Sequence, residues 1–128
     1  MLVEIVFKEG SNDSYLRQNA LGTLQKFSLR KQAQNIMIDC DVIKWIVETL
    51  ANGQDSLSDY TLEYATALLM NLSLRSKGKD VCEKLPSQLN VLKILAEMME
   101  HDNLQVRTHV NGTLYSILTR KSLKDQAN

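Results

Sequence analysis

The sequence is poor in the residues that mark disulfide-linked, metal-binding or extracellular domains. Its 128 residues include one proline, one tryptophan and two cysteines, Cys40 and Cys82. The cysteines lie in separate segments and lack the CxxC spacing of metal and redox sites. We therefore expect free, buried thiols in a reducing compartment.

An excess of charge and a long apolar run are also missing. Fifteen basic and fifteen acidic side chains cancel, so no overall field favours nucleic acid or an anionic membrane. The longest apolar runs, such as LVEIVF at residues 2–7, are far too short to span a bilayer. The same start lacks the features of a secretory signal. We expect no nucleic-acid partner and no membrane insertion.

Motifs of catalysis and metal binding are absent too. There is no G-x-S-x-G, no glycine-rich phosphate loop and no HExxH. The histidines, His101 and His109, have no cysteine or paired acid at metal-ligand spacing. We therefore expect no enzyme, no metal and no cofactor.

What the sequence does contain is an internal repeat. Arg30, Arg75 and Arg120 follow one another at intervals of 45 residues. At this shift YLRQNALGTLQKFSLR lies over YTLEYATALLMNLSLR and over QVRTHVNGTLYSILTR. Three columns are always apolar, and their spacing of four and then three is that of one helical face. They are Ala20, Ala65 and Val110; Leu24, Leu69 and Leu114; and Phe27, Leu72 and Ile117.

A second repeated motif lies between these long helices. VIKWIVETL at 42–50 matches VLKILAEMM at 91–99, and LVEIV at 2–6 matches the last five positions of both. Here the shift is 49 residues, because the connection before the second copy is four residues longer than the connection before the first. The loop after the second copy is four residues shorter, which restores the 45-residue period. Insertions confined to loops are typical of stacked helical units. Each unit therefore has a short helix (Gln32–Ile38 and Lys79–Lys84), a middle helix and a long helix.

This order of helices is the armadillo pattern. We predict an all-α, armadillo-type α-solenoid, a right-handed superhelix of three-helix repeats. The predicted division is the end of one repeat at 1–30, full repeats at 31–75 and 76–120, and the start of another at 121–128. Because both ends are cut within a repeat, we expect the chain to be a fragment of a longer protein.

The recurring arginine has a structural interpretation. The long helices begin beside acids, with Ser14, Ser58 and Asp102 as candidate caps, and they end in bases. This arrangement complements the helix dipole, at about 0.3–1 kcal/mol for each charge. An arginine at a helix end can also bond to free carbonyls or to an acid of a neighbouring repeat.

It also has a functional interpretation, and the two can both hold. In armadillo folds the third helices line the concave face, where residues spaced by four form rows. A fourth column, Gly22, Ala67 and Gly112, is small in every repeat and then gives a bare floor. Beside this small column, partly exposed arginines form a ladder that binds the carboxylates of an extended or helical acidic protein segment. The rows are Gln18, Gly22, Lys26 and Arg30; Glu63, Ala67, Asn71 and Arg75; and Thr108, Gly112, Ser116 and Arg120.

Several stretches carry a more specific resemblance. SDYTLEYATALLMNLSLR and VNGTLYSIL are much more specific than armadillo spacing, and from Tyr15 onward nearly the whole chain resembles the armadillo repeat-containing protein nine family. The family's LisH motif is not in this sequence.

The resemblance implies part of the armadillo array of a non-enzymatic scaffold. For that family it implies the basal body, centriole and axoneme, ciliogenesis, axonemal microtubule stability, a link to Joubert syndrome, and partners among TOG-domain microtubule regulators. The alternative is an adaptor whose concave groove binds acidic segments of cargo or tubulin tails.

Overall fold

The computed structural model describes residues 15–53, 57–85 and 89–120, and every regular element in these ranges is an α-helix. The predicted all-α class is therefore confirmed. The LVEIV motif at 2–6, the candidate cap Ser14 and the segment 121–128 lie outside the described residues.

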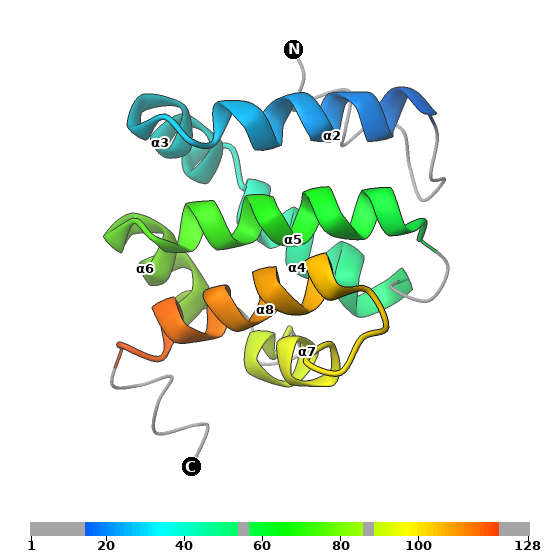
Figure 1. Ribbon diagram of the computed structural model, residues 1–128. Helices are drawn as coiled ribbons and strands as arrows, with labels where there is room; N and C mark the ends of the chain where they lie inside the picture. Colours follow the sequence, from blue (N-terminus) through cyan, green and yellow to red (C-terminus); the bar gives the residue numbers. More distant parts are fainter. Residues whose placement is uncertain (1–14, 54–56, 86–88, 121–128) are drawn as a thin grey trace.

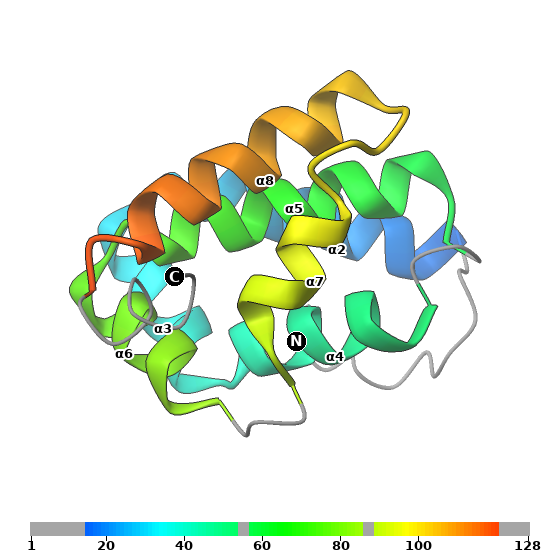
Figure 2. The same cartoon turned by 90° about the horizontal axis from the view of Figure 1, so that it is seen from below.

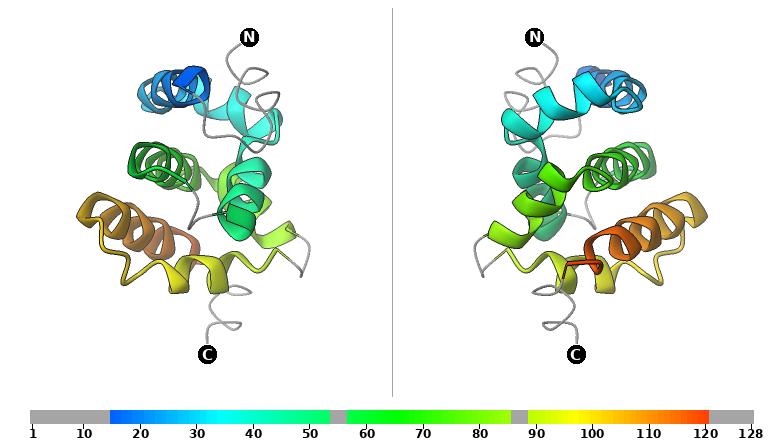
Figure 3. Two further views of the ribbon diagram at one scale, coloured as in Figure 1. Left: turned by 90° about the vertical axis from the view of Figure 1, so that its right-hand side faces the viewer. Right: turned by 90° about the vertical axis from the view of Figure 1, so that its left-hand side faces the viewer.

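Three long helices form one layer of the molecule. They are α2 (Tyr15–Phe27), α5 (Asp59–Ser73) and α8 (Leu104–Ile117). α5 packs against both of the others, and the three run side by side across the view in Figure 1. Figure 3 shows the same helices end-on as a single stack. These are the predicted third helices of successive units.

The short and middle helices form the second layer. They are α3 (Lys31–Asp39), α4 (Val42–Gly53), α6 (Ser76–Lys84) and α7 (Val91–Glu97). α4 lies against α5, α6 and α7, so each unit packs its middle helix beneath its own third helix and beside the next unit (Figures 1 and 2). The order of short, middle and long helices is as predicted.

Several helix ends differ from the sequence prediction, among them both ends of α3, which extends one residue beyond the predicted Gln32–Ile38 on each side. α6 begins at Ser76, three residues before the predicted Lys79, and includes Gly78 in its first turn. A Cβ atom at Gly78 would collide with the Leu72 carbonyl oxygen and lie 2.8 Å from its carbon. Glycine, a poor helix former in isolation, is therefore required by a close backbone approach. α7 ends at Glu97, and Met98 is its C-cap.

The core runs between the two layers and contains the predicted apolar columns. Leu69, Leu72 and Ile117 are fully buried. Two members of the columns are not: Phe27 is 45% exposed, and Leu114 is half-buried. Both lie on an outer helix of the stack, α2 or α8, which has a described third-helix neighbour on one side only.

Polar caps begin the long helices. The Ser58 hydroxyl accepts a hydrogen bond from the Thr61 N–H at 3.3 Å, as predicted. At α8 the prediction of Asp102 was wrong, because Asn103 is the cap and accepts from the Val106 N–H at 3.1 Å. No helix in the described ranges combines the length and apolar character needed to cross a membrane.

Candidate functional site

The three repeated arginines occupy the same kind of turn, directly after a third helix. Each donates its backbone N–H to the carbonyl three residues earlier. The bonds run from Arg30 to Phe27 at 3.0 Å, from Arg75 to Leu72 at 3.3 Å and from Arg120 to Ile117 at 3.0 Å. Arg30 and Arg75 are also the N-cap residues of α3 and α6. We call this edge of the stack the arginine edge, and define it by Arg30, Arg75 and Arg120.

Arg120 is held by the short helix of its own unit. Its Nη1 lies 2.9 Å from a carboxylate oxygen of Asp80 and 3.2 Å from one of Glu83, and its Nη2 donates to the Ser76 carbonyl oxygen at 3.0 Å. The side chain is 31% exposed. Arg120 thus bonds a carbonyl oxygen and two acids, as in the structural interpretation, but the acids belong to its own unit and not to a neighbouring repeat.

Arg75 has no such partners. Its side chain makes no hydrogen bond or ion pair with any residue in the described ranges, and its Nε is buried. At the 45-residue shift, the positions of Asp80 and Glu83 correspond to Asn35 and Ile38 of α3, neither of which is acidic. The same turn thus holds a paired arginine in one repeat and an unpaired one in the preceding repeat.

Arg30 is exposed and makes no side-chain cap to the helix it precedes. Beside it Leu29 is 71% exposed, and at the equivalent position beside Arg75 the Leu74 side chain is 59% exposed. The arginine edge therefore carries two exposed leucines, each directly before an arginine. The sequence interpretation missed both, although Leu29 and Leu74 align at the 45-residue shift, with Thr119 as the third member of their column.

Only part of each predicted row stays on one face of its third helix. A step of four residues advances about 400° around a helix of 3.6 residues per turn, so each step drifts about 40° off the starting face. After two steps the row has turned toward the neighbouring helix, and Asn71 and Ser116 are buried. The prediction that these two residues face a partner was wrong, whereas Lys26 is exposed.

The buried part of the rows joins successive units. Asn71 Nδ2 donates to Ser28 Oγ at 2.8 Å, and Gln18 Nε2 donates to Ser58 Oγ at 3.2 Å. One unit further, Glu63 accepts from Asn103 Nδ2 at 2.9 Å. Gln18 and Glu63 are equivalent positions, so each holds the N-cap residue of the following third helix. In the last row Thr108 is exposed and donates to Leu104 O at 2.9 Å.

The small column is covered by side chains rather than bare. A Cβ at Gly22 would lie 3.2 Å from the ring of Tyr64, and one at Gly112 would lie 2.6 Å from the sulfur of Met70. Ala67 is 5% exposed. The expectation of an accessible floor was wrong, because small residues here let side chains of the adjacent third helix pack closely.

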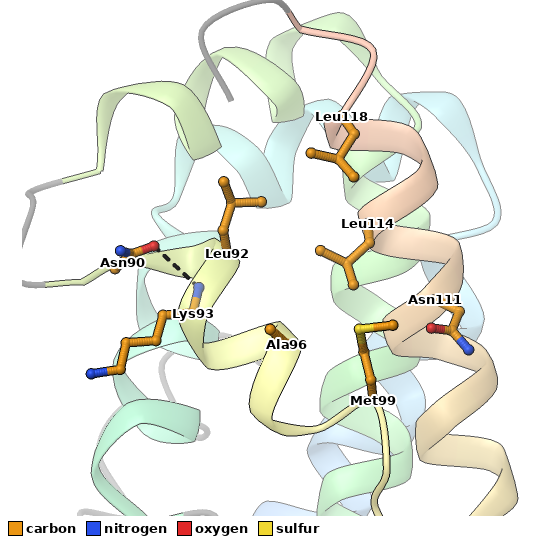
Figure 4. A pocket seen from close by; sticks show the side chains of 8 residues that line it. All are labelled: Asn90, Leu92, Lys93, Ala96, Met99, Asn111, Leu114 and Leu118. Atoms are coloured by element: carbon orange, nitrogen blue, oxygen red, sulfur yellow. Dashed lines mark hydrogen bonds between the residues drawn. The ribbon is translucent and has the colours of Figure 1, made fainter. Parts of the chain in front are cut away.

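An apolar groove of about 490 Å³ lies between α7 and α8, as Figure 4 shows. Leu92 and Ala96 of α7 and Met99 after it line one side, and Leu114 of α8 and Leu118 at its C-cap line the other. In the preceding repeat the equivalent positions are packed against the next unit and are at most 1% exposed. They are Ile43, Val47, Leu50, Leu69 and, at the position of Leu118, Ser73. The groove therefore has the composition of a surface that a further unit covers, and carries no reactive group.

The thiols and histidines offer no reactive cluster. Within the described ranges no three His, Cys, Asp or Glu side chains are placed to hold a metal ion. Burial, with a smaller effect of Glu83, raises the pKa of the Cys82 thiol to about 12, so it is not a thiolate. Burial lowers the pKa of His109, which lies 3.1 Å from the Thr66 hydroxyl, and Glu63 partly offsets this shift.

Comparison with known proteins agrees with this architecture. The family model described as "LisH domain-containing protein ARMC9, ARM repeats" matches residues 37–128. The chain belongs to this family. The predicted resemblance and the armadillo type of the fold are thereby confirmed.

Relatives of the same name are similar over nearly the whole chain. LisH domain-containing protein ARMC9 of Homo sapiens is 48% identical over 126 residues, and that of Danio rerio is 47% identical over 120 residues. These alignments cover 98% and 94% of this chain but 15% and 14% of the relatives. The chain thus spans about one seventh of the length of the relatives it matches. No solved structure matches it.

Proposed function

We propose that this armadillo segment is a non-enzymatic protein-interaction scaffold. The single observation that carries the proposal is the third-helix layer of a repeat array that belongs to the ARMC9 family. Stacked helical repeats expose an extended surface, and binding proteins is the usual role of such surfaces. Tyr60, Leu74 and Tyr115 are 65%, 59% and 82% exposed on or beside this layer and offer apolar contacts to a partner.

The finer proposal is that the scaffold works at the cilium. Resemblance to the armadillo repeat-containing protein nine family supports a place at the basal body and axoneme, a role in ciliogenesis and axonemal microtubule stability, and TOG-domain regulators as partners. The absence of charge excess in the sequence accords with a protein partner rather than a nucleic acid.

A chimaera tests this function. In ciliated cells that lack their own ARMC9 protein, the full-length human relative is expressed with its matching 126 residues replaced by this chain. We expect recruitment to the basal body and recovery of ciliation and of axonemal microtubules in the cold. Tyr60→Ser with Tyr115→Ser tests the exposed surface, and full recovery by a protein that lacks the segment would sink the proposal.

The second candidate, an adaptor for acidic protein segments, rests on a specific observation. The guanidinium of Arg75 is half-buried and unpaired among the described residues, beside the exposed Arg30 on the arginine edge. Carboxylates are natural partners of such a group.

A further inference from the structure

Two equivalent arginines, Arg120 and Arg75, have unequal surroundings. Arg120 binds two carboxylates and a carbonyl oxygen, all from the short helix of its own unit. Arg75 stands at the equivalent position in the preceding unit, whose short helix α3 has asparagine and isoleucine at the positions of those acids. Arg120 thus shows that an arginine at this position binds carboxylates, and Arg75 occupies the equivalent position without them.

The partial burial of Arg75 increases the effect of lacking a partner. Arg75 is half-buried, and its Nε has no hydrogen-bond partner in the described part of the chain. A partly buried guanidinium without a nearby acid is stabilised by a carboxylate that reaches its Nη atoms, through charge-assisted hydrogen bonds in surroundings less polar than water. An exposed surface arginine such as Arg30 has much less to gain.

The charged side chains of α3 and α6 also leave Arg75 without an acid among the described residues. Every acidic side chain of α3 and α6 is already paired: Asp39 with Lys77, and both Asp80 and Glu83 with Arg120. Arg30, Lys31, Arg75 and Lys79 have no acidic partner in the described ranges. α2 and α5 are neighbours, so Arg30 and Arg75 lie roughly one helix spacing apart, about 10 Å.

Apolar surface adjoins this positive edge. Leu29 and Leu74 directly precede the two arginines and are 71% and 59% exposed. A ligand that covers both kinds of group carries acids together with apolar side chains. That description fits a protein segment and does not fit a free inorganic anion.

We propose that Arg75 binds a carboxylate of an acidic, leucine-containing segment of a partner protein, at the place that Asp80 and Glu83 take beside Arg120. Arg30 takes a second acid of that segment, and Leu74 contacts one of its apolar side chains. This proposal rests on the scaffold function and specifies its partner chemistry.

The test uses a defined probe and the whole chain. The probe is a short fluorescein-labelled peptide of glutamate, leucine and glycine, and its control has glutamine for every glutamate. Fluorescence anisotropy gives the affinity, and the Arg75 Nε–H signal in a ¹H–¹⁵N spectrum reports on the site itself. We expect binding of the glutamate peptide only, with a shift of that signal.

Three variants locate the site. Arg75→Gln should weaken binding about tenfold, which corresponds to one charge-assisted contact of about 1.4 kcal/mol. Asn35→Asp, at an exposed position, supplies a carboxylate within the chain and should compete to a similar extent without loss of fold. Lys93→Gln removes an exposed charge on α7, in the other layer, and should change the affinity less than about twofold.

Other results would overturn the inference. Equal affinity of the wild-type chain and both Arg75→Gln and Asn35→Asp would mean that the acids bind elsewhere. Failure of the glutamate peptide to bind or to shift the Arg75 signal would remove the site. If inorganic phosphate shifts that signal and the peptide does not, the ligand is a phosphate group. None of these outcomes affects the chimaera experiment, which tests the scaffold function separately.

Discussion

Glu63 of α5 accepts a hydrogen bond of 2.9 Å from Asn103, the residue that caps the next third helix. Asn103 thus satisfies the N-terminus of α8 with its oxygen and joins two repeats with its amide nitrogen. Gln18 and Ser58 repeat the relationship one unit earlier. The stacking of third helices is therefore fixed by polar bonds at their N-terminal ends as well as by the core.

Asn103→Ala should cost about 2–3 kcal/mol of unfolding free energy, because it removes both a helix cap and a bond to a charged acceptor. Asn90→Ala is the matched control: Asn90 caps α7 by accepting from Lys93 N–H at 3.1 Å and makes no described bond to another unit. It should cost about 1 kcal/mol. Urea denaturation measures both, and equal costs would contradict the linking role of Asn103.

Gly78→Ala should destabilise the protein by about 1–3 kcal/mol, because the new methyl group meets the backbone carbonyl of Leu72 and the α5–α6 turn must shift. Gly112→Ala meets only the flexible end of Met70, so it should be neutral or gain up to about 1 kcal/mol of helix propensity. Thermal unfolding of the two variants distinguishes backbone contact from side-chain contact. Similar shifts in Tm would refute the distinction.

The repeat and its helices could be predicted from sequence because apolar columns record the shared face of each helix. Leu24, Leu69 and Leu114 return at one interval, and all three lie on the inner side of their layer. The start of α6 was missed because Gly78 reads as a helix breaker unless the close approach of Leu72 is known.

The site was less predictable, for two physical reasons. A row spaced by four residues drifts around the helix, so Asn71 and Ser116 are buried between units instead of lining a face. The arginine period was visible, and Asp80 and Glu83 lie within the predicted helix Lys79–Lys84, but spacing alone does not show that this short helix packs beside the end of its own third helix. The structure supplies that contact, which separates Arg120 from Arg75.

The paired and unpaired arginines should differ in their effect on stability. Arg120→Met leaves Asp80 and Glu83 without their cation and should cost about 1 kcal/mol, less at high salt because the pairs are partly exposed. Arg75→Met removes a buried Nε without an acceptor and should be neutral or stabilising. Urea denaturation at low and high salt tests this, and a larger loss from Arg75→Met would show an undetected partner of Arg75.

Stability should decrease as the pH falls below the ordinary histidine pKa of 6.5, because of His109. Burial lowers its pKa in the folded state, so in this range the unfolded chain binds the proton first and is favoured. The loss is complete once the pH is below the lowered pKa. His109→Gln should remove this part of the pH dependence, and His101, present in both proteins, cancels in the comparison. Parallel stability curves between pH 7 and 5 would contradict the shift.

The groove between α7 and α8 leads to a prediction about the array. If a further unit covers it, Leu114→Ala should cost more in a longer chain than in this one. In the present chain Leu114 is half-buried and the cost should be about 1 kcal/mol. In a chain extended by about 45 residues of a relative's following sequence, one further period, the cost should rise to about 2–4 kcal/mol.

Leu69→Ala is the control, because Leu69 occupies the equivalent position of α5 and is fully buried already. Its cost, about 2–5 kcal/mol, should be the same in both chains. Urea denaturation of the four variants and their two parents gives the comparison. An equal cost of Leu114→Ala in the two chains would mean that the added unit leaves the groove open, and the groove would then be accessible to another partner.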